Sequence, residues 1–436
     1  MTSIFVALIV LGVIIVIHEF GHFAVAKLFR IKVETFSVGF GPRLIGFRRG
    51  ETDYRISALP LGGYVKMSGE TPGDAITGDP REFMSKPKWQ RFLVASAGPF
   101  MNIVLAFVLI TALFMHGMDV PEYFNNQAVV GIVTPDSAAA KAGIRQNDRI
   151  LQIEDREKPN WQNIWLTVGT NPERPLSIVL DRAGQRIDTT LTPALDKRSA
   201  TGDAGMGPQL RAIVKGVRVG GPAALAGMRP NDEIVSINGI DPRTTGKQLT
   251  DTIQTIQEKT FPVVVMRDGR EIELNVTPIT EGGRKLIGIE QGYATVFIKL
   301  PMMDAMKQSV QMNSENAKLI FQILGRLVRR EASMKQLDGP IGIVRASGEA
   351  ASVGLTALIT LTAMISLNLG LVNLLPIPIL DGGVMLLLLI ETLMGRDLSL
   401  RVKERVVQVS MVFLLLMMVV VLYNDVIKLL PPTAAP

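Results

Sequence analysis

The sequence predicts a polytopic α-helical membrane protein with four transmembrane helices, a membrane-associated β-hairpin element and two inserted α+β domains. Hydrophobic residues make up 47% of the 436 residues, and they gather in a few long runs. The stretch from Ile4 to Ile17 carries no charge, as expected of a segment that spans a bilayer. Residues 126–280, by contrast, are polar with many short β-type runs. We therefore expect a membrane part interrupted by a folded soluble part.

The first transmembrane segment, residues 1–29, contains the pattern His18-Glu19-Phe20-Gly21-His22. Residues four apart lie on one face of a helix, so both imidazoles can bind one metal ion. Glu19 beside them can hold a metal-bound water as a general base. Two polar residues buried in a core helix are the alternative, but ionisable groups at membrane depth are costly and are functional candidates. Because the segment lacks a basic start and a small-residue cleavage site, we expect it to be retained.

Residues 30–91 form a polar segment with eleven Lys and Arg residues. Strand-like patterning covers residues 35–41 and 54–67, and Gly39, Gly41, Gly62 and Gly63 suit bends or close backbone approach. This pattern predicts a β-hairpin element beside the active site, although a plain cytosolic loop also fits it.

The second transmembrane helix is expected at residues 92–115. Gly98 near its start allows a close approach of another helix, and Pro99 suits a first turn or a break. Asn102 is a lone amide in an apolar helix, so it is either a contact between helices or part of the site. His116 at the far end fits an interfacial residue better than a ligand.

Residues 126–280 contain a tandem repeat. The stretch Ala142 to Ile153 matches the stretch Ala226 to Ile237 at an offset of 84 residues, and Asp181-Arg-Ala-Gly and Arg267-Asp-Gly recur within one residue of that register. Units of this length fold as separate domains, which we place at residues 126–197 and 205–280. The repeated pattern resembles PDZ domains, with Asp148 and Asp232 in a turn before a core strand. PDZ domains bind extended peptides at a strand edge, so peptide binding is one interpretation and a rigid steric filter is the other.

The rest of the chain returns to the membrane. Residues 299–337 have the spacing of an amphipathic helical segment. Residues 354–394 form a third transmembrane region, and residues 406–423 form a fourth transmembrane helix. Pro376 and Pro378 break the third region and free backbone groups inside the bilayer, which is tolerated only where protein or a cavity surrounds them.

Asp381 follows these prolines and is the only acidic residue between Glu349 and Glu391. It is either a buried structural carboxylate or the third ligand of the metal that His18 and His22 bind. Two histidines and one carboxylate, with water in the fourth position, form a known catalytic zinc arrangement. Iron or manganese can use similar ligands, so the assignment of zinc rests on the motif. The chain has no cysteine, which excludes disulfides, cysteine-ligated zinc and thiol catalysis.

A metal site inside the bilayer requires a substrate that is also in the bilayer. A helix protects its own peptide bonds by hydrogen bonding, so the substrate must be held in an extended form. The hairpin within residues 35–67 could pair with such a segment, and Asn373 or Asn102 could hold freed carbonyls. The break at Pro376 and Pro378 belongs to the same candidate substrate-binding region.

The orientation follows from the loops. Residues 30–91 and the turn at 395–405 are rich in Lys and Arg and lie on the same side of a four-span protein. By the positive-inside rule this side is cytoplasmic, which places the inserted domains outside and the active site toward the cytoplasm. The net charge of +6 is modest, and the positively charged residues flank the apolar runs. Membrane orientation explains these residues better than a nucleic-acid partner does.

His18-Glu19-x-x-His22, Gly98-Pro99-x-x-Asn102 and Asn373-x-x-Pro376-x-Pro378-x-Leu380-Asp381-Gly, with tandem PDZ domains between them, resemble the site-2 intramembrane metalloproteases. The resemblance covers essentially the whole chain. It implies Zn²⁺ bound by His18, His22 and Asp381, with Glu19 as the catalytic glutamate. It also implies substrate contacts at Asn373 and a membrane-associated β element at Gly39-Phe40-Gly41. Val384 departs from the family, whose members commonly have His or Arg there, but that position is not a ligand.

The resemblance also implies the partners and the location. The expected substrates are a single-span anti-sigma factor already trimmed outside by another protease, and remnant signal peptides, within the bacterial inner membrane. A non-enzymatic scaffold whose PDZ pair recruits envelope peptides is the alternative. A metal transporter would need polar residues in more than two spans, and the fourth span lacks them.

Overall fold

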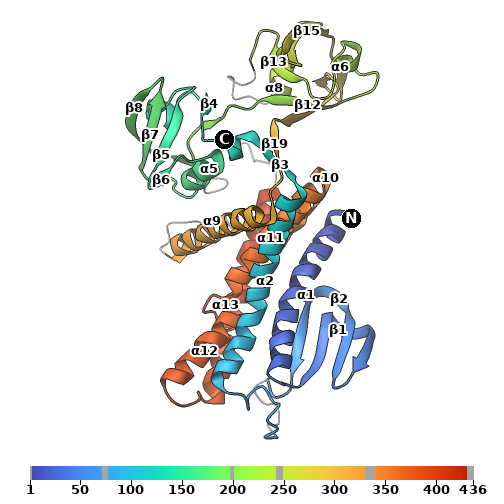
Figure 1. Ribbon diagram of the computed structural model, residues 1–436, viewed down its shortest axis with the longest axis vertical. Coiled ribbons are helices and arrows are strands. Elements are labelled where there is room, and N and C mark those ends of the chain that lie inside the picture. The colour runs from blue at the N-terminus through green and yellow to red at the C-terminus, as the bar shows by residue number, and fades with distance from the viewer. Residues whose placement is uncertain (1, 71–76, 197–200, 242–248, 329–338, 430–436) are drawn as a thin grey trace. The chain divides into compact units, whose positions relative to one another are not determined.

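The computed structural model describes residues 2–70, 77–196, 201–241, 249–328 and 339–429 (Figure 1). Contacts divide the chain into two compact units, residues 1–118 with 299–436 and residues 119–298. We call the first the membrane unit and the second the inserted unit. The expected amphipathic segment 299–337 lies outside the described residues beyond Val328, as do small parts of the expected hairpin segment and of both repeat units.

The membrane unit is built from long apolar helices. Four of them are long and apolar enough to span a bilayer: Thr2–Leu28, Lys88–His116, Leu355–Asn373 and Arg401–Val426. Four candidate spans is the number of transmembrane helices that the sequence predicts. The helices of this unit are α1 (Thr2–Leu28), α2 (Lys88–His116), α9 (Met302–Val328), α10 (Pro340–Val353), α11 (Leu355–Asn373), α12 (Asp381–Leu393) and α13 (Leu400–Leu429). The described part of the third apolar region is thus two helices joined by a turn.

Helix α2 is the centre of this unit and contacts α1, α9, α11 and α12. Glycines bring the backbones together, as is common between membrane helices. A Cβ on Gly21 of α1 would lie 2.4 Å from the carbonyl oxygen of Ala97 in α2, and one on Gly370 of α11 would lie 2.8 Å from the carbonyl oxygen of Pro99. Neither position therefore accepts a larger side chain without movement of the helices.

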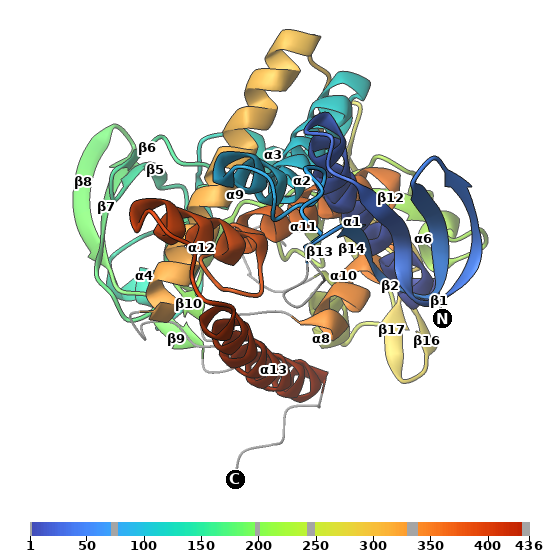
Figure 2. The same cartoon turned by 90° about the horizontal axis from the view of Figure 1, so that it is seen from below.

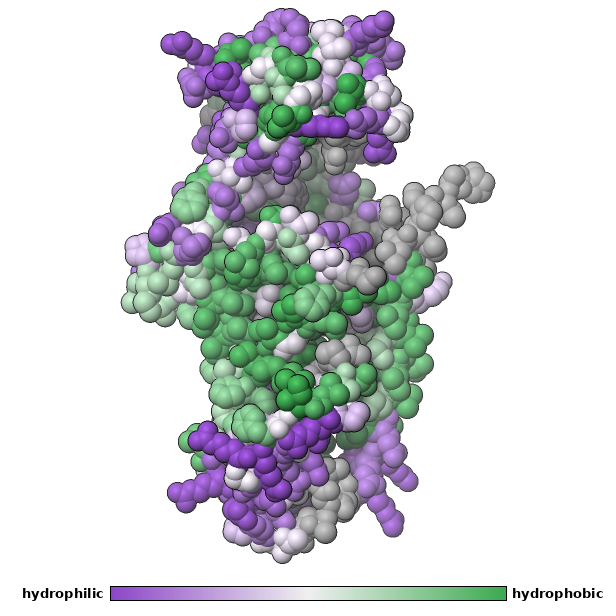
Figure 3. All heavy atoms as spheres, turned by 90° about the vertical axis from the view of Figure 1, so that its right-hand side faces the viewer, coloured by the Kyte–Doolittle hydropathy of each residue, from purple (hydrophilic) through white to green (hydrophobic). Residues whose placement is uncertain are grey.

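The outer surface of the membrane unit is apolar. Large side chains such as Phe5 on α1, Phe100 on α2 and Leu416 on α13 are more than half exposed. Figure 3 shows a broad hydrophobic face over these helices, with hydrophilic side chains at its lower border. An exposed apolar face of this extent indicates contact with lipid.

A bent two-stranded sheet packs against α1 (Figure 2). Strands β1 (Val33–Arg49) and β2 (Thr52–Met67) are long, and each contributes two segments to the sheet. Residues 33–38 lie between residues 53–56 and residues 63–67, while residues 43–49 pair with 52–57. Gly39 and Gly41 have φ angles of +94° and +87°, which favour glycine, and they make the bend between the two parts of β1. The expected strands are therefore present, but they form four antiparallel segments. Residues 63–67 lie at one edge.

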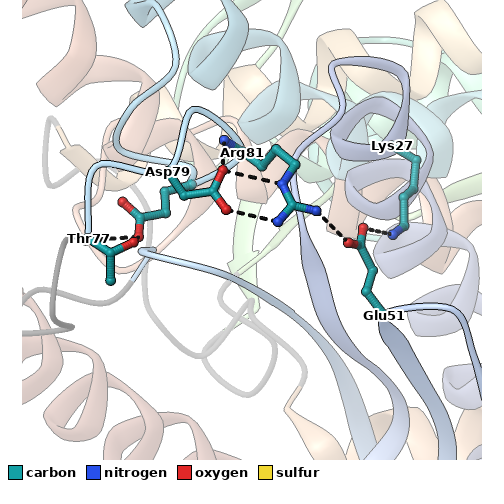
Figure 4. A network of polar contacts seen from close by, with 6 residues as sticks. Lys27, Glu51, Thr77, Asp79 and Arg81 are labelled. Atoms are coloured by element: carbon teal, nitrogen blue, oxygen red, sulfur yellow. Dashed lines mark hydrogen bonds and ion pairs between the residues drawn. The ribbon is translucent and has the colours of Figure 1, made fainter.

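A charged network covers the end of α1 (Figure 4). Lys27 donates to Glu51 in the turn between β1 and β2, at 2.9 Å. Arg81 donates to the same carboxylate at 3.3 Å and to Asp79 at 2.9 Å. These side chains are partly exposed, so salt and water weaken each pair. Their main effect is to place polar groups where α1 leaves the apolar layer.

The inserted unit contains two β-rich domains in tandem, each with its own hydrophobic core. In the first domain one sheet has the order β6-β5-β7-β8, and in the second the order is β15-β14-β13-β12-β18. The elements of the first are β4 (Val130–Val133), α4 (Ala138–Lys141), β5 (Arg149–Ile153), β6 (Arg156–Glu157), α5 (Trp161–Gly169), β7 (Leu176–Arg182), β8 (Gln185–Leu191), β9 (Ala194–Asp196), β10 (Thr201–Asp203) and β11 (Met206–Pro208). Those of the second are β12 (Ala212–Val217), α6 (Pro222–Leu225), β13 (Glu233–Ile237), α8 (Leu249–Thr255), β14 (Phe261–Arg267), β15 (Arg270–Val276), β16 (Ile279–Glu281), β17 (Arg284–Leu286) and β18 (Ile289–Tyr293).

Two further strands frame the tandem domains. Strand β3 (Met118–Pro121), which is followed by α3 (Glu122–Asn125), pairs with β19 (Thr295–Ile298). The two ends of the inserted segment therefore lie side by side.

The repeated Asn-Asp motif holds the same ion pair in both domains. Asp148 and Asp232 are each 1% exposed, and they accept hydrogen bonds at 2.7 Å from Arg182 and Arg267, respectively. Burial by itself would raise the pKa of Asp232, but the hydrogen bonds from Arg267 and from the Arg229 amide hold that pKa below its usual value. The repeat thus preserves a structural clamp between a turn and a strand.

Candidate metal centre

Two histidines and one aspartate meet between α1 and α12. His18 and His22 are buried, and their Nε2 atoms are 3.2 Å apart. Asp381 Oδ2 lies 3.1 Å from Nε2 of His18, and Asp381 Oδ1 lies 3.5 Å from Nε2 of His22. Among the described residues this is the only group of three or more His, Cys, Asp or Glu whose potential ligand atoms all lie within 4.8 Å of one another.

The turn after α11 brings Asp381 to the histidines. Helix α11 ends at Asn373, and α12 begins at Asp381, with Pro376 and Pro378 in the turn between them. The chain folds tightly here, because a Cβ on Gly382 would lie 2.3 Å from the Leu375 carbonyl oxygen. Asp381 also occupies the first turn of α12, where the helix dipole favours a carboxylate.

Helix α2 contacts the outer nitrogen of each imidazole. Nδ1 of His22 lies 2.8 Å from the carbonyl oxygen of Val94, and Nδ1 of His18 lies 3.2 Å from the Asn102 amide. With Nδ1 engaged in this way, Nε2 of each histidine points toward Asp381. Such contacts to the second nitrogen orient metal-binding histidines.

Gly98 of α2 lies directly against the two Nε2 atoms, where no Cβ would fit. A Cβ at this position would lie 2.3 Å from Nε2 of His22 and 2.7 Å from Nε2 of His18. Two imidazoles and one carboxylate are the protein donor set of a catalytic zinc site, in which water takes the fourth position. The residues present therefore fit a zinc ion.

Glu19 follows His18 directly and lies beside the sheet. A Cβ on Gly63 would lie 3.3 Å from Cγ of Glu19 and 2.8 Å from the carbonyl oxygen of Ser37. Gly63 belongs to the edge segment 63–67 of the sheet. In sequence Glu19 lies between the two histidines. In space its side chain lies next to the edge of the sheet.

The other predicted site residues are more dispersed. Asn373 is half-buried at the end of α11, Pro376 is exposed and Pro378 is half-buried. Gly39 and Gly41 lie in the bend of β1. Asn102 is fully buried with its amide against His18, so it contacts the histidine in addition to linking helices.

Sequence reasoning missed one contribution to this site, the carbonyl group of Val94, which has no sequence signal because every residue carries one. Gly63 did have a signal, since it belongs to a pair of adjacent glycines inside a strand pattern, which favours close approach of another group. The structure places it beside Glu19.

The profile of peptidase family M50 matches residues 6–417. The chain therefore belongs to this family of site-2 type, zinc-dependent intramembrane metalloproteases, and the predicted class of enzyme and its zinc cofactor are confirmed.

Individual relatives match along nearly the whole chain. A Salmonella typhimurium protein named regulator of sigma-E protease RseP is 32% identical over 451 residues, which cover 97% of this chain and 98% of the relative. The Escherichia coli protein of that name is 30% identical with the same coverage. A putative zinc metalloprotease of Treponema pallidum is 29% identical over 446 residues, covering 98% of this chain and 99% of the relative.

Proposed function

We propose that His18, His22 and Asp381 bind the catalytic zinc ion and that Glu19 is the general base and acid. The observation that carries this proposal is the convergence of three potential ligand atoms, all within 4.8 Å of one another, beside Gly98 of α2. When bound, zinc would supply an acidified water and a Lewis acid for the scissile carbonyl. Glu19 would accept a proton from the attacking water and return it to the leaving amine.

The sheet edge supports a role in holding the substrate. Residues 63–67 pair with residues 33–38 on one side, and Gly63 brings this edge next to Glu19. An extended peptide can add to such an edge by β-augmentation, which would keep a helical segment unwound beside the zinc site. In this proposal Gly39 and Gly41 shape the sheet, and Asn373, Pro376 and Pro378 line the path near Asp381.

The ligand assignment is tested by Asp381→Ala. Loss of one of three protein ligands should lower the zinc content of the purified protein. Loss of a residue that only supports a metal ligand can lower activity by up to about 100-fold. Loss of the ligand itself should therefore lower cleavage of a single-span reporter in detergent by about 100-fold or more. Asp397→Ala, which removes an exposed partner of Lys88, is the matched control and should cleave normally. A non-enzymatic scaffold predicts instead that Asp381→Ala leaves function intact.

The substrate class follows from the family and from the loops. Relatives are named for regulation of sigma-E, which favours an anti-sigma factor of single-span type and remnant signal peptides as substrates. The basic segment 30–91 favours a cytoplasmic position for the sheet and for the nearby zinc site. We place the chain in the bacterial inner membrane with the inserted unit in the periplasm.

We further propose that the two inserted domains are PDZ domains that act as a steric filter. Their support is the repeated turn with a buried Asp and a strand Arg in each domain. A filter excludes substrates that still carry a bulky outer domain, whereas a recruiting module would bind the trimmed end.

Removal of residues 122–294 distinguishes the filter from a recruiting module. Because β3 and β19 pair, a short linker can rejoin the chain. The deletion variant should cleave untrimmed reporter as fast as trimmed reporter, while wild type prefers the trimmed form. Slower cleavage of trimmed reporter by the variant would instead support recruitment.

A further inference from the structure

Asn102 is a fully buried amide in the middle of the apolar part of α2. Its side chain is 0% exposed and lies 3.2 Å from Nδ1 of His18. Its Oδ1 atom is buried without a hydrogen-bond partner. An unpartnered acceptor in an apolar interior is costly, which raises the question of which amide atom faces the imidazole.

The neighbouring His22 shows which proton arrangement suits a zinc ligand. The Val94 carbonyl can only accept, so its 2.8 Å contact requires the proton of His22 on Nδ1. The lone pair of Nε2 then points into the site, where a metal can use it. His18 must carry its proton on Nδ1 for the same reason, and that proton needs an acceptor.

The only partner that the described residues offer to Nδ1 of His18 is the Asn102 amide. The oxygen and nitrogen of an amide are interchangeable by a 180° rotation of the group. With the oxygen toward His18, the orphaned acceptor gains a partner and the imidazole gains the tautomer that frees Nε2. With the nitrogen toward His18, the proton moves to Nε2 and blocks the metal.

We infer that Asn102 is the positioning residue of His18, whose carboxamide oxygen accepts the Nδ1 proton and so presents Nε2 to zinc. This inference rests on the proposed metal site. It assigns the two histidines to different supports on one helix, a backbone carbonyl for His22 and a side chain for His18. It also separates Asn102 from substrate binding.

Contacts from α11 fix the position of Asn102. The hydroxyl of Ser366 donates to the Asn102 carbonyl at 2.8 Å and is fully buried. A Cβ on Gly370 would lie 3.2 Å from Cβ of Asn102. Helix α11 therefore holds the backbone of Asn102 while the side chain turns toward α1.

Two variants separate the roles of the amide. Asn102→Leu has similar size but no acceptor, so its zinc affinity, measured by competition with a chromophoric chelator, should fall about 10- to 100-fold. Asn102→Asp keeps an acceptor and has no donor, so it should bind zinc as tightly as wild type. Thr111→Ala removes another buried polar side chain of α2, away from the histidines, and should leave zinc affinity unchanged.

The outcomes that overturn the inference are distinct. Wild-type zinc affinity in Asn102→Leu, or equal losses in the Leu and Asp variants, would contradict it. A higher KM at saturating zinc with unchanged zinc affinity would assign Asn102 to the substrate. If Asp381→Ala loses zinc and Asn102→Leu does not, the metal site stands and the positioning role fails. Thermal melting of the zinc-free variants shows whether each still folds, and added zinc should restore cleavage by Asn102→Leu.

Discussion

Glu19→Gln is expected to abolish cleavage while the zinc ion stays bound. Glutamine keeps the shape of the side chain but cannot accept a proton. Because the same carboxylate would act first as base and then as acid, we expect the loss at the upper end of the range for such catalysis, about 10⁴-fold. The zinc ligands are untouched, so the metal content should equal that of wild type. Cleavage of the single-span reporter and metal analysis on the same preparation measure both quantities.

The matched control for this variant is Glu51→Gln. Glu51 is a partly exposed carboxylate that pairs with Lys27 at the end of α1, outside the metal centre, and its loss should leave cleavage near the wild-type rate. Activity retained by Glu19→Gln would exclude this residue as the proton carrier. A loss of zinc along with activity would show that the residue supports the metal, and the loss would then carry no information on proton transfer.

The metal centre could be predicted largely because its signals are local or isolated. His18 and His22 are one helical turn apart, so their common face follows from helix geometry alone. Asp381 was noticeable because acidic residues are costly in an apolar run. In the folded structure these three side chains lie within 3.5 Å of one another. The sequence singled out Gly98 and Asn102 on α2, but which atoms of these residues meet the imidazoles depends on the packing between helices.

The sheet and the inserted domains show the same division between local and tertiary information. Alternation predicted strands in β1 and β2, but the double pairing depends on where the strands bend and on what covers them. The repeat predicted two similar domains and placed Asp148 and Asp232 in turns. The sequence also showed that Asp181-Arg and Arg267-Asp recur, yet the pairing of these arginines with the buried aspartates needs the folded sheet.

Gly98→Ala is expected to eliminate both zinc binding and cleavage. The added methyl group would lie 2.3 Å from Nε2 of His22 and 2.7 Å from Nε2 of His18, closer than carbon and nitrogen atoms can approach without movement. The imidazoles can avoid it only by turning away, and His22 would then lose its hydrogen bond to Val94. We therefore expect no zinc in the purified variant and cleavage at background level.

Gly12→Ala is the matched control for Gly98→Ala, because a Cβ on Gly12 of the neighbouring helix α1 meets nothing within 4 Å. It should keep its zinc and its activity. Alanine stabilises a helix relative to glycine by roughly 1 kcal/mol, so neither variant should melt early through poor helix formation. A melting temperature near that of zinc-free wild type, together with absent zinc, would locate the defect of Gly98→Ala at the ligands. Normal zinc content in Gly98→Ala would contradict the expectation that the methyl group displaces the two imidazoles from the metal-binding arrangement.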